Sequence, residues 1–511
     1  MLSFVLRRVG VSILILIAAS FLMYTLVALA RDPLEDLYAS NSPNKDALIA
    51  QRTAWLNLDQ PIPVRWFNWF LGAARCVIPF GGCDLGVTIQ NQPVTIVLAR
   101  AMGATLQLVT ASTILAIVLG ILVGIVSALR QYSAIDYSFT FASFLFYSLP
   151  SFVMGVLLKV FVALGFNDWL DSPVFTWPWI IALSLVSGVF WQAIIGGPRQ
   201  RRLVVFLASV VTTGAMLYGM SVTAWFLNPS LGPILTPLLI AAFGAAMVLI
   251  IAGARARYAW RTAGVTVIVL IAAYFVLQPF LKSFNGWGVF ALFVAASLVG
   301  AVAGWFLGEY DKGQAIRIGI LTGALGMGVI ILDQFMQNWN SYVNNPKVNG
   351  RPIATIGSET PNLQGDWWIQ SIDTFTHLLL PTISLMLISF AAYTRYSRGG
   401  MLETLNQDYI RTARAKGLPE RTVVVRHAFR NSLIPITTIV AADVGALIGG
   451  AIITERIFAF SGMGALFNQG LQHADPNPVM AYFVVIAVFA ITFNFLADLA
   501  YSAIDPRVRV K

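Results

Sequence analysis

Long apolar segments dominate this sequence, and shorter polar segments that contain most of the arginine and lysine residues separate them. An apolar run of about 20 residues is long enough to cross the hydrocarbon core of a bilayer as a helix. With breaks placed at glycine, proline and charged residues, the pattern predicts twelve spans. They are residues 9–30, 104–129, 137–165, 177–196, 203–227, 232–253, 262–281, 286–308, 315–333, 377–394, 432–454 and 479–500. We therefore expect an all-α polytopic membrane protein with about 12 transmembrane helices.

Three polar intervals are long enough to hold structure of their own: residues 31–103, 334–376 and 395–430. The first is predicted to lie outside and contains an amphipathic stretch around Trp55, Trp66, Trp69 and Phe70. We expect this stretch to lie at the membrane interface. The second predicts an ordered outer loop, and the third predicts a cytoplasmic loop.

The distribution of basic residues predicts the orientation. Cytoplasmic loops of membrane proteins carry an excess of lysine and arginine. With the N-terminus inside, 22 of the 33 basic residues fall in predicted cytoplasmic segments. One more or one fewer span would invert every later loop and destroy this pattern. Both termini are therefore predicted to be cytoplasmic.

The first apolar run has two interpretations. Arg7 and Arg8 precede it, and Ala28-Leu29-Ala30 at its end resembles a signal-peptidase site. The apolar part of a cleavable signal is about 7–15 residues long, whereas this run extends over residues 9–30. We therefore favour a retained first helix over a cleaved signal peptide.

The composition agrees with a membrane protein and excludes several other classes. Apolar residues make up 58% and charged residues 11% of the 511 residues, against roughly 25% charged residues in a soluble domain. Basic loops on one side of a membrane explain the net charge of +10, so we expect no nucleic-acid partner. The sequence has no HExxH, CxxC or GxSxG motif, and without a Gly-Lys dipeptide it has no Walker A loop. We expect no catalytic, cofactor-binding or metal-binding residues, so any ATP that drives this protein must bind to another chain.

Charged residues within or near the predicted spans are rare: Lys159, Asp443 and Asp498. Such residues are candidates for function, but a proton or ion relay would need more of them, so we favour interhelical hydrogen bonds. Cys76 and Cys83 both fall in the first outer loop, where disulfides persist. We expect a Cys76–Cys83 disulfide, with two free thiols as the alternative.

The cytoplasmic segment 395–430 carries the most specific pattern. Gly417-Leu418-Pro419 predicts the end of one helix, and Pro419-Glu420-Arg421 predicts the start of a second short helix that runs to Phe429. Two short helices joined at a glycine would form a rigid protrusion whose small residues allow the backbone of another protein to approach. The pattern is equally typical of a basic loop that contacts anionic lipid.

At this segment the chain resembles the permeases of ABC importers, specifically the first, or B-type, permease subunit of the dipeptide, oligopeptide and nickel branch. The resemblance to the coupling loop of that family lies in DYIRTARAKGL at 408–418 and RHAFRNSLIP at 426–435. Further similar motifs are HLLLP at 377–381, ERIF at 455–458, SGMG at 461–464, DPR at 505–507, LNLDQP at 56–61 and DLG at 84–86. Together they run through roughly residues 1–165 and 377–511.

The resemblance implies a six-helix type I ABC importer permease core that is interrupted by about six extra helices. The first helix (1–30), the outer loop region (31–103) and core helices 2 and 3 (104–165) come before an inserted transmembrane block at 166–333. The outer loop 334–376 and the remaining core helices at 377–511 follow it. An insertion that starts and ends outside must contain an even number of spans, so six leave the orientation of the core unchanged.

The resemblance also implies the function: a permease subunit of an ATP-driven importer, most often for di- or oligopeptides, that couples ATP hydrolysis to alternating access. The implied partners are a second permease subunit, two ATP-binding subunits (or one, as a dimer), an extracytoplasmic substrate-binding protein and the lipid of the bacterial cell membrane. ATP and Mg²⁺ would be bound by the ATP-binding subunits. The residues implied to contact them are Tyr409, Arg411, Ala413, Arg414, Ala415, Lys416, Gly417, Arg426, His427 and Arg430.

Three alternatives remain. A nickel chelate or another small solute could replace the peptide, because the same branch carries both. A twelve-span secondary transporter would need two related halves, whereas here the family-like segments flank an unrelated middle. A membrane scaffold or receptor without transport would lack ATP-binding subunits in its complex, which is the observation that separates these classes.

Overall fold

The computed structural model describes residues 2–504 except 77, 79–80, 310, 434–435, 437–438, 441–442 and 444–450. In these residues the regular secondary structure is helical, and β-bridges are limited to one isolated antiparallel bridge between Val87 and Pro93. The chain forms two compact units. Unit 1 comprises residues 1–162, 355–358 and 378–511, and unit 2 comprises residues 163–354 and 359–377.

The described part of the chain contains 11 helices that are long and apolar enough to cross a membrane. Each corresponds to one of the twelve predicted spans, and the remaining predicted span, 432–454, lies mostly outside the described residues. The protein is therefore an all-α, multi-pass membrane protein.

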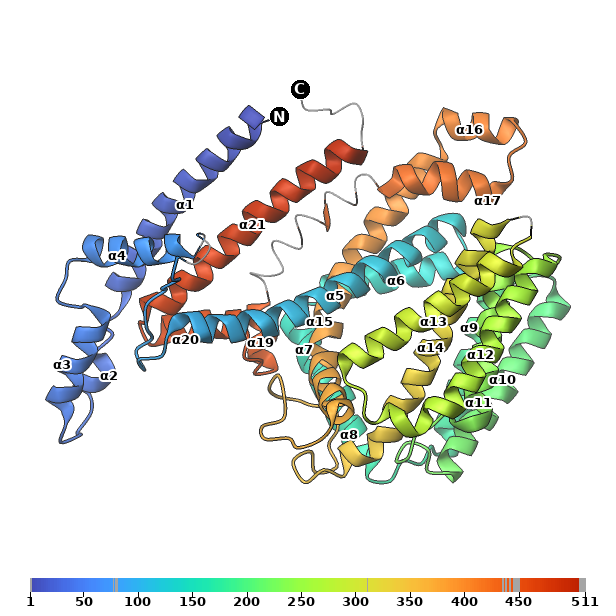
Figure 1. The fold of residues 1–511 in the computed structure, drawn as a ribbon, viewed down its shortest axis with the longest axis horizontal. Helices are drawn as coiled ribbons and strands as arrows, with labels where there is room; N and C mark the ends of the chain where they lie inside the picture. The colour runs from blue at the N-terminus through green and yellow to red at the C-terminus, as the bar shows by residue number, and fades with distance from the viewer. Residues whose placement is uncertain are drawn as a thin grey trace. The chain divides into compact units, whose positions relative to one another are not determined.

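In unit 1, α1 packs along α21, and α20 packs against both α5 and α21 (Figure 1). The helices of this unit are α1 (Leu2–Ala30), α2 (Glu35–Tyr38), α3 (Lys45–Leu56), α4 (Ile62–Arg75), α5 (Val94–Leu129), α6 (Ala134–Ser148), α7 (Ser151–Leu157), most of α15 (Trp367–Leu405), α16 (Asp408–Ala415), α17 (Glu420–Thr422), α19 (Ile452–Ile457), α20 (Met463–Gln472), α21 (Pro476–Ile504) and two π-helical turns, η1 (Leu158–Leu164) and η2 (Val423–Phe429).

The predicted span 137–165 is not one straight helix, which corrects the prediction. It breaks between α6 and α7 at Leu149 and Pro150. Leu149 has an extended backbone with ψ 127°, because the proline ring that follows disfavours the helical conformation of the preceding residue. A second helical stretch then runs from Ser151 through η1 and α8 (Gly165–Leu170).

The amphipathic part of the first outer loop packs on the protein itself, and its place at the membrane interface stays a prediction. The Trp66 ring lies 5.1 Å from the Phe21 ring of α1, and its Nε1 donates to Ser20 Oγ at 3.2 Å. Trp69 is 6% exposed and donates to the Leu85 carbonyl at 3.2 Å. Trp66 therefore attaches α4 to α1, and Trp69 attaches α4 to the segment around Leu85.

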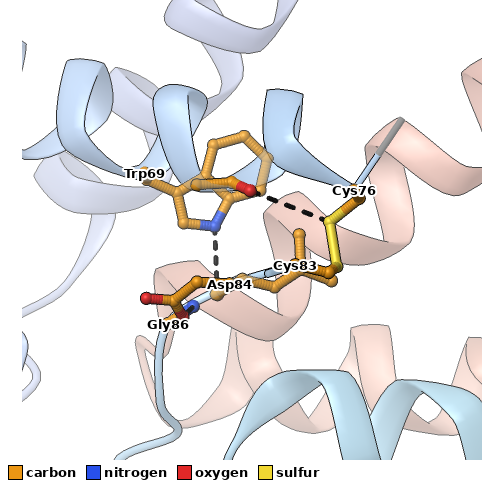
Figure 2. Close-up of a disulfide and its surroundings, with 7 residues drawn as sticks. Trp69, Cys76, Cys83, Asp84 and Gly86 are labelled. Atoms are coloured by element: carbon orange, nitrogen blue, oxygen red, sulfur yellow. Dashed lines mark hydrogen bonds between the residues drawn. A yellow bond between two sulfur atoms is a disulfide. The ribbon is translucent and has the colours of Figure 1, made fainter. Parts of the chain in front are cut away.

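A disulfide closes the loop after α4 (Figure 2). It joins Cys76 and Cys83, whose Cα atoms are 4.2 Å apart. Next to it, the Asp84 side chain accepts a hydrogen bond from the Gly86 amide at 2.9 Å. The disulfide thus ties the end of α4 to the segment 83–86, in which the Leu85 carbonyl accepts from Trp69.

Unit 2 is built around α14, against which α11, α12 and α13 pack (Figure 1). Its helices are α8, α9 (Trp177–Ile195), α10 (Arg199–Val222), α11 (Gly232–Ile251), α12 (Arg257–Leu281), α13 (Gly286–Leu307), α14 (Lys312–Val343) and the first turns of α15. Gly300 and Gly319 bring α13 and α14 into backbone contact, since a Cβ at Gly300 would lie 2.0 Å from the Gly319 carbonyl oxygen. Small residues allow this approach in membrane helices.

The outer loop predicted at 334–376 is shorter in the structure, where it covers residues 344–366 between α14 and α15. The residues after 333 look like a loop because the segment is rich in Asn, Pro, Trp and Gly, but Gln334, Asn338 and Tyr342 are buried. Asp333, which is 0% exposed, accepts hydrogen bonds from the Leu231 amide at 2.7 Å and the Tyr274 hydroxyl at 3.1 Å. These partners come from α12 and the start of α11. They satisfy the buried carboxylate, so α14 can continue past Asp333 as a helix.

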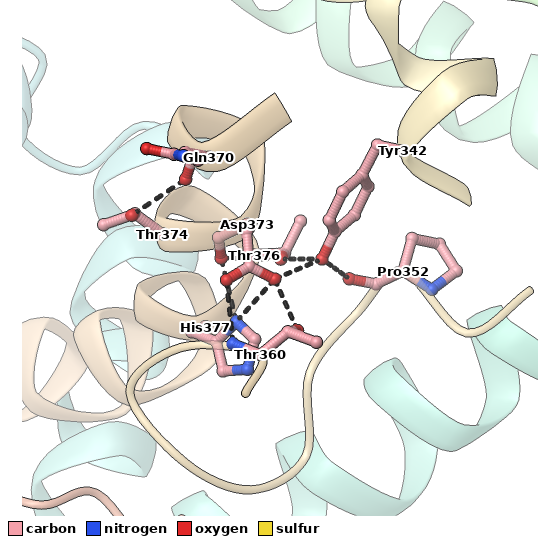
Figure 3. A network of polar contacts seen from close by, with 8 residues as sticks. All are labelled: Tyr342, Pro352, Thr360, Gln370, Asp373, Thr374, Thr376 and His377. Atoms are coloured by element: carbon pink, nitrogen blue, oxygen red, sulfur yellow. Dashed lines mark hydrogen bonds and ion pairs between the residues drawn. The ribbon is translucent and has the colours of Figure 1, made fainter. Parts of the chain in front are cut away.

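A second buried network holds the shortened loop to α15 (Figure 3). The Tyr342 hydroxyl donates to Asp373 Oδ1 at 3.1 Å and lies 2.9 Å from Thr376 Oγ1. Asp373 also accepts from the Thr360 hydroxyl at 2.6 Å, and His377 Nδ1 lies 2.9 Å from the Asp373 carbonyl. His377, the first residue of a family-like motif, is therefore part of a structural network inside unit 2.

Candidate functional site

The cytoplasmic loop folds as two short helices beyond the end of α15 (Figure 1). The first, α16, ends at Ala415, and Gly417, two residues later, has φ +76°. The Gly417 amide donates to the Arg414 carbonyl at 2.9 Å, and the Leu418 amide donates to the Ala413 carbonyl at 3.4 Å. This pair of bonds is the Schellman arrangement, which needs a left-handed residue and so favours glycine.

An ion pair holds the two helices together across this turn. Arg414 donates from Nε to Glu420 Oε2 at 3.1 Å and from a terminal nitrogen to Oε1 at 2.6 Å. The Arg414 guanidinium is the main cause that lowers the pKa of the Glu420 carboxyl. Such a bidentate pair fixes direction as well as distance, so the turn has a defined shape.

The second helix has Pro419 as its N-cap, begins at Glu420 and passes from α17 into the π-helical turn η2. Across the pair, Asn431 Nδ2 donates to the Tyr409 hydroxyl at 3.0 Å. Together with the Arg414–Glu420 ion pair, this bond joins the start and end of the loop.

The inner face of the pair packs on the ends of α5 and α15. Its apolar cluster comprises Ala128, Met401, Ile410, Ala413, Val423 and Ala428. Ala413 is 7% and Ala428 is 0% exposed, so their small size serves packing inside this chain and leaves them unavailable to a partner. The exposed candidates are Tyr409, Arg411, Arg414, Ala415, Lys416, Gly417, Arg426 and Arg430, and His427 is half-buried.

Asp136, which lies outside the loop and which no sequence motif indicated, positions the end of α15 that carries the loop. Asp136, 2% exposed at the start of α6, accepts from Arg398 Nε at 2.8 Å and from a terminal nitrogen of Arg398 at 3.0 Å. It also accepts from the Ser127 hydroxyl and from the Tyr132 amide. The hydrogen bond from Arg398 holds the pKa of the Asp136 carboxyl well below its usual range.

The same part of α15 is held to α6 by an aromatic contact. The Arg395 guanidinium carbon lies 3.8 Å from the centroid of the Tyr147 ring and 5.9 Å from that of Phe144. A cation over an aromatic face is attracted by the ring quadrupole. The end of α15 that carries the helix pair is therefore fastened to α6 by Arg395 and Arg398, which contact Tyr147 and Asp136 near opposite ends of α6.

Chemically, the exposed face of the helix pair offers arginine and lysine side chains on a rigid backbone. Among the described residues, no group of three His, Cys, Asp or Glu side chains could hold a metal ion. The arrangement therefore presents a basic surface next to the end of α15.

The sequence matches two family models. A model described as "Binding-protein-dependent transport system inner membrane component" matches residues 202–510, and one described as "Binding-prot-dependent transport system membrane comp, N-term" matches residues 1–115. The first alone covers more than half of the chain.

Individual relatives agree with these matches. The chain is 35% identical over 231 residues to the oligopeptide transport system permease protein OppB of Mycobacterium tuberculosis. This alignment covers 43% of this chain and 69% of that protein. It is 41% identical over 156 residues to AppB of Bacillus subtilis, an oligopeptide transport system permease protein (30% and 48% covered). It is 43% identical over 140 residues to the dipeptide transport system permease protein DppB of Escherichia coli (27% and 41% covered). The chain therefore belongs to the family of inner membrane components of binding-protein-dependent transport systems.

Proposed function

We propose that this chain is one of two permease subunits in an ATP-driven importer of di- and oligopeptides. The relatives described above are named as permeases of oligopeptide and dipeptide systems, which favours peptides over nickel chelates or other small solutes. The observation that carries the mechanism is the rigid helix pair at the end of α15.

ATP binds to separate subunits in this proposal. The sequence has no Gly-Lys dipeptide and hence no Walker A loop. The complex would contain a second permease subunit, two ATP-binding subunits that hold ATP and Mg²⁺, and an extracytoplasmic substrate-binding protein. This chain would bind no cofactor of its own.

The helix pair would dock in a groove of an ATP-binding subunit through its exposed face, which includes Arg411, Lys416 and Arg426. Closure of the ATP-binding subunits would then move the pair as a rigid body. Because α15 continues from the pair into the membrane, that movement would change the access of the transport path from one side to the other. The orientation follows, with the pair and both termini in the cytoplasm of a bacterial cell.

The test is purification of the tagged chain from its native membrane, followed by reconstitution into liposomes. We expect ATP-binding subunits in the complex and uptake of labelled trialanine that requires ATP inside and the binding protein outside. Uptake of a nickel chelate in place of trialanine would reject the peptide assignment. A complex without any ATP-binding subunit would reject the importer itself.

A further inference from the structure

Three adjoining pockets form one groove in unit 1 along α20. The largest, of about 540 Å³, lies between α20, α19 and the start of α5. It shares Gln92, Gln469 and Gln472 with a pocket of about 390 Å³, which shares Gln472 and His473 with a third that reaches α2. We call these three pockets the polar groove. Its volume is in the range of ligand sites, and its contributing segments all belong to predicted outer loops or helix ends.

The floor of the polar groove is held in place by a carboxylate. Glu455 is 0% exposed; its Oε1 accepts from the Thr105 hydroxyl at 2.6 Å and its Oε2 from the Ala465 amide at 3.1 Å. Gly462 leaves room for it, since a Cβ there would lie 2.3 Å from Glu455 Oε1. These donors occupy both Glu455 oxygens, so Glu455 shapes the groove and leaves ligand binding to other residues.

One end of the polar groove is positively charged. Arg100 and Arg456 line the largest pocket, and both side chains are exposed. In the part of the chain that the structure describes, neither guanidinium has an ion pair or a hydrogen bond. Two guanidinium groups with free donors are suited to a carboxylate, which they bind through charge-assisted hydrogen bonds.

The middle of the polar groove is lined by side-chain amides. Gln92, Asn468, Gln469 and Gln472 alternate there with apolar side chains such as Val97 and Leu466. An amide both donates and accepts, so it can pair with the N–H and C=O groups of any peptide backbone. Such a lining fits peptides of varied sequence.

The other end contains a buried carboxylate with a free oxygen. Asp475 is 3% exposed and lines the second pocket. Its Oδ2 accepts from the Ile89 amide at 2.7 Å, whereas its Oδ1 is buried without a hydrogen-bond partner among the described residues. A buried acceptor that lacks a donor is costly. A peptide ammonium group at this end of the groove would be attracted by the negative charge of Asp475.

We propose that the polar groove binds a short extended peptide, with the peptide carboxylate at Arg100 and Arg456 and the peptide ammonium directed to Asp475. This inference rests on the peptide import proposed above and adds a binding site in the permease with a defined polarity. The charged ends select free peptide termini, and the amides between them accept any backbone.

The test measures equilibrium binding to the purified transporter complex without its binding protein. The ligands are radiolabelled trialanine, its C-terminal amide and its N-acetyl derivative. Trialanine has both charged termini, the amide lacks the carboxylate, and the N-acetyl derivative lacks the ammonium group. We expect the parent complex to bind trialanine about tenfold or more tightly than either derivative, because each derivative loses a charge-assisted hydrogen bond. Equal binding of the three ligands, or no binding of trialanine, would overturn the proposal.

Single substitutions then assign each end. Arg456→Gln should weaken the binding of trialanine about tenfold and leave the binding of the C-terminal amide unchanged. Asp475→Asn should also weaken the binding of trialanine about tenfold, but it should leave the binding of the N-acetyl derivative unchanged. Arg75→Gln removes an exposed charge outside the groove and should change nothing. A variant that weakens all three ligands equally has altered the fold of the groove and would contradict a terminus-specific role.

Uptake by the parent complex keeps this result separate from the proposed function. Peptide uptake with no trialanine binding to the groove would leave the importer in place and reject the groove as its site. Trialanine binding without ATP-dependent uptake would reject the importer and keep the groove.

Discussion

Arg398 and Asp136 lie 262 positions apart in the sequence and are joined by two hydrogen bonds of 2.8 and 3.0 Å. The Asp136 side chain is 3% exposed and the Arg398 side chain 29%. Arg398 lies near the end of α15, close to the helix pair that we propose to dock on an ATP-binding subunit. The Arg398–Asp136 ion pair therefore holds the part of α15 that carries the helix pair against α6.

Breaking this ion pair should destabilise the protein. Asp136→Asn leaves the partly buried guanidinium without its counter-charge, and removal of one partner of a buried pair costs about 3–5 kcal/mol. We expect a clear fall in the thermal unfolding temperature in detergent and a loss of transport. Arg261→Gln is the matched control, because Arg261 is 61% and its partner Glu309 54% exposed and exposed pairs contribute about 1 kcal/mol or less. Equal effects of the two variants would contradict a special role for Arg398–Asp136.

Gly417 tests the coupling proposal. A Cβ at this position meets nothing within 4 Å, so Gly417→Arg fits sterically within this chain and incurs only the left-handed backbone penalty of about 1–2 kcal/mol. We expect the variant to insert and fold, but to lose uptake by releasing the ATP-binding subunits or by uncoupling their hydrolysis.

Gly417→Asn is the control, because asparagine tolerates the left-handed conformation better than other side chains. It should keep the fold and most of the coupling. If the loop instead contacts anionic lipid, an added arginine would be neutral or would strengthen membrane contact. Full uptake by Gly417→Arg would therefore end the coupling interpretation.

The disulfide between Cys76 and Cys83 closes a short loop. The chain-entropy model gives about 2–3 kcal/mol for a loop of this size. Reduction, or Cys76→Ser with Cys83→Ser, should lower the unfolding temperature modestly and leave ATP hydrolysis unchanged. Mass spectrometry of a nonreduced digest measures the bond directly, and two alkylated thiols in that digest would refute it.

The charge pattern predicts that three loops of unit 2 face the cytoplasm. Single cysteines at the exposed positions Gln200, Ala254 and Lys312, in a background without Cys76 and Cys83, should resist an impermeant thiol reagent in intact cells. Lys347→Cys in the outer loop is the control that should react. Labelling of any of the three positions would contradict the twelve-span topology.

Asp475 predicts a pH-dependent stability. Burial raises the pKa of its carboxyl to about 6, above the ordinary value near 4. The folded state therefore binds this proton more tightly than the unfolded state, and the fold loses stability as the pH rises from about 4 to about 6. The loss approaches about 3 kcal/mol above that window.

Asp475→Asn removes the titrating group and keeps an oxygen for the Ile89 amide. Its unfolding temperature should equal that of the parent near pH 4 and exceed it above pH 6. His473 and Arg52 act electrostatically on the same carboxyl, so His473→Gln serves to exclude a contribution from histidine titration. A difference between variant and parent that stays constant from pH 4 to 8 would refute the assignment.

The sequence by itself determined the membrane character, the helical spans and the helix pair of the cytoplasmic loop. Apolar run length and charge are local properties of a helix in a bilayer, so hydropathy predicts where spans lie. The turn at Gly417 was predictable for the same reason, because a Gly-Leu-Pro sequence ends a helix through its own backbone preferences.

The break between α6 and α7 was predictable from the sequence, whereas the end of α14 was not. Pro150 marks the break between α6 and α7, and the proline rule alone would have placed it. Residues 334–343 at the end of α14 look like a loop in the sequence because the segment 334–376 is rich in Asn, Pro, Trp and Gly. The burial of Tyr342 depends on partners from α15, and no local pattern reports those partners.

Only the tertiary structure decided which distant residues meet. Arg398 was counted with the basic residues of the loop, and the structure alone gave it Asp136 as a partner. Ala413 was expected at an exposed tip, and packing on Met401 buried it. The polar groove likewise combines Arg100, Arg456 and Asp475 from three separate segments. A side chain's burial and charge environment arise from contacts between segments, whereas the sequence pattern records only the preferences within each one.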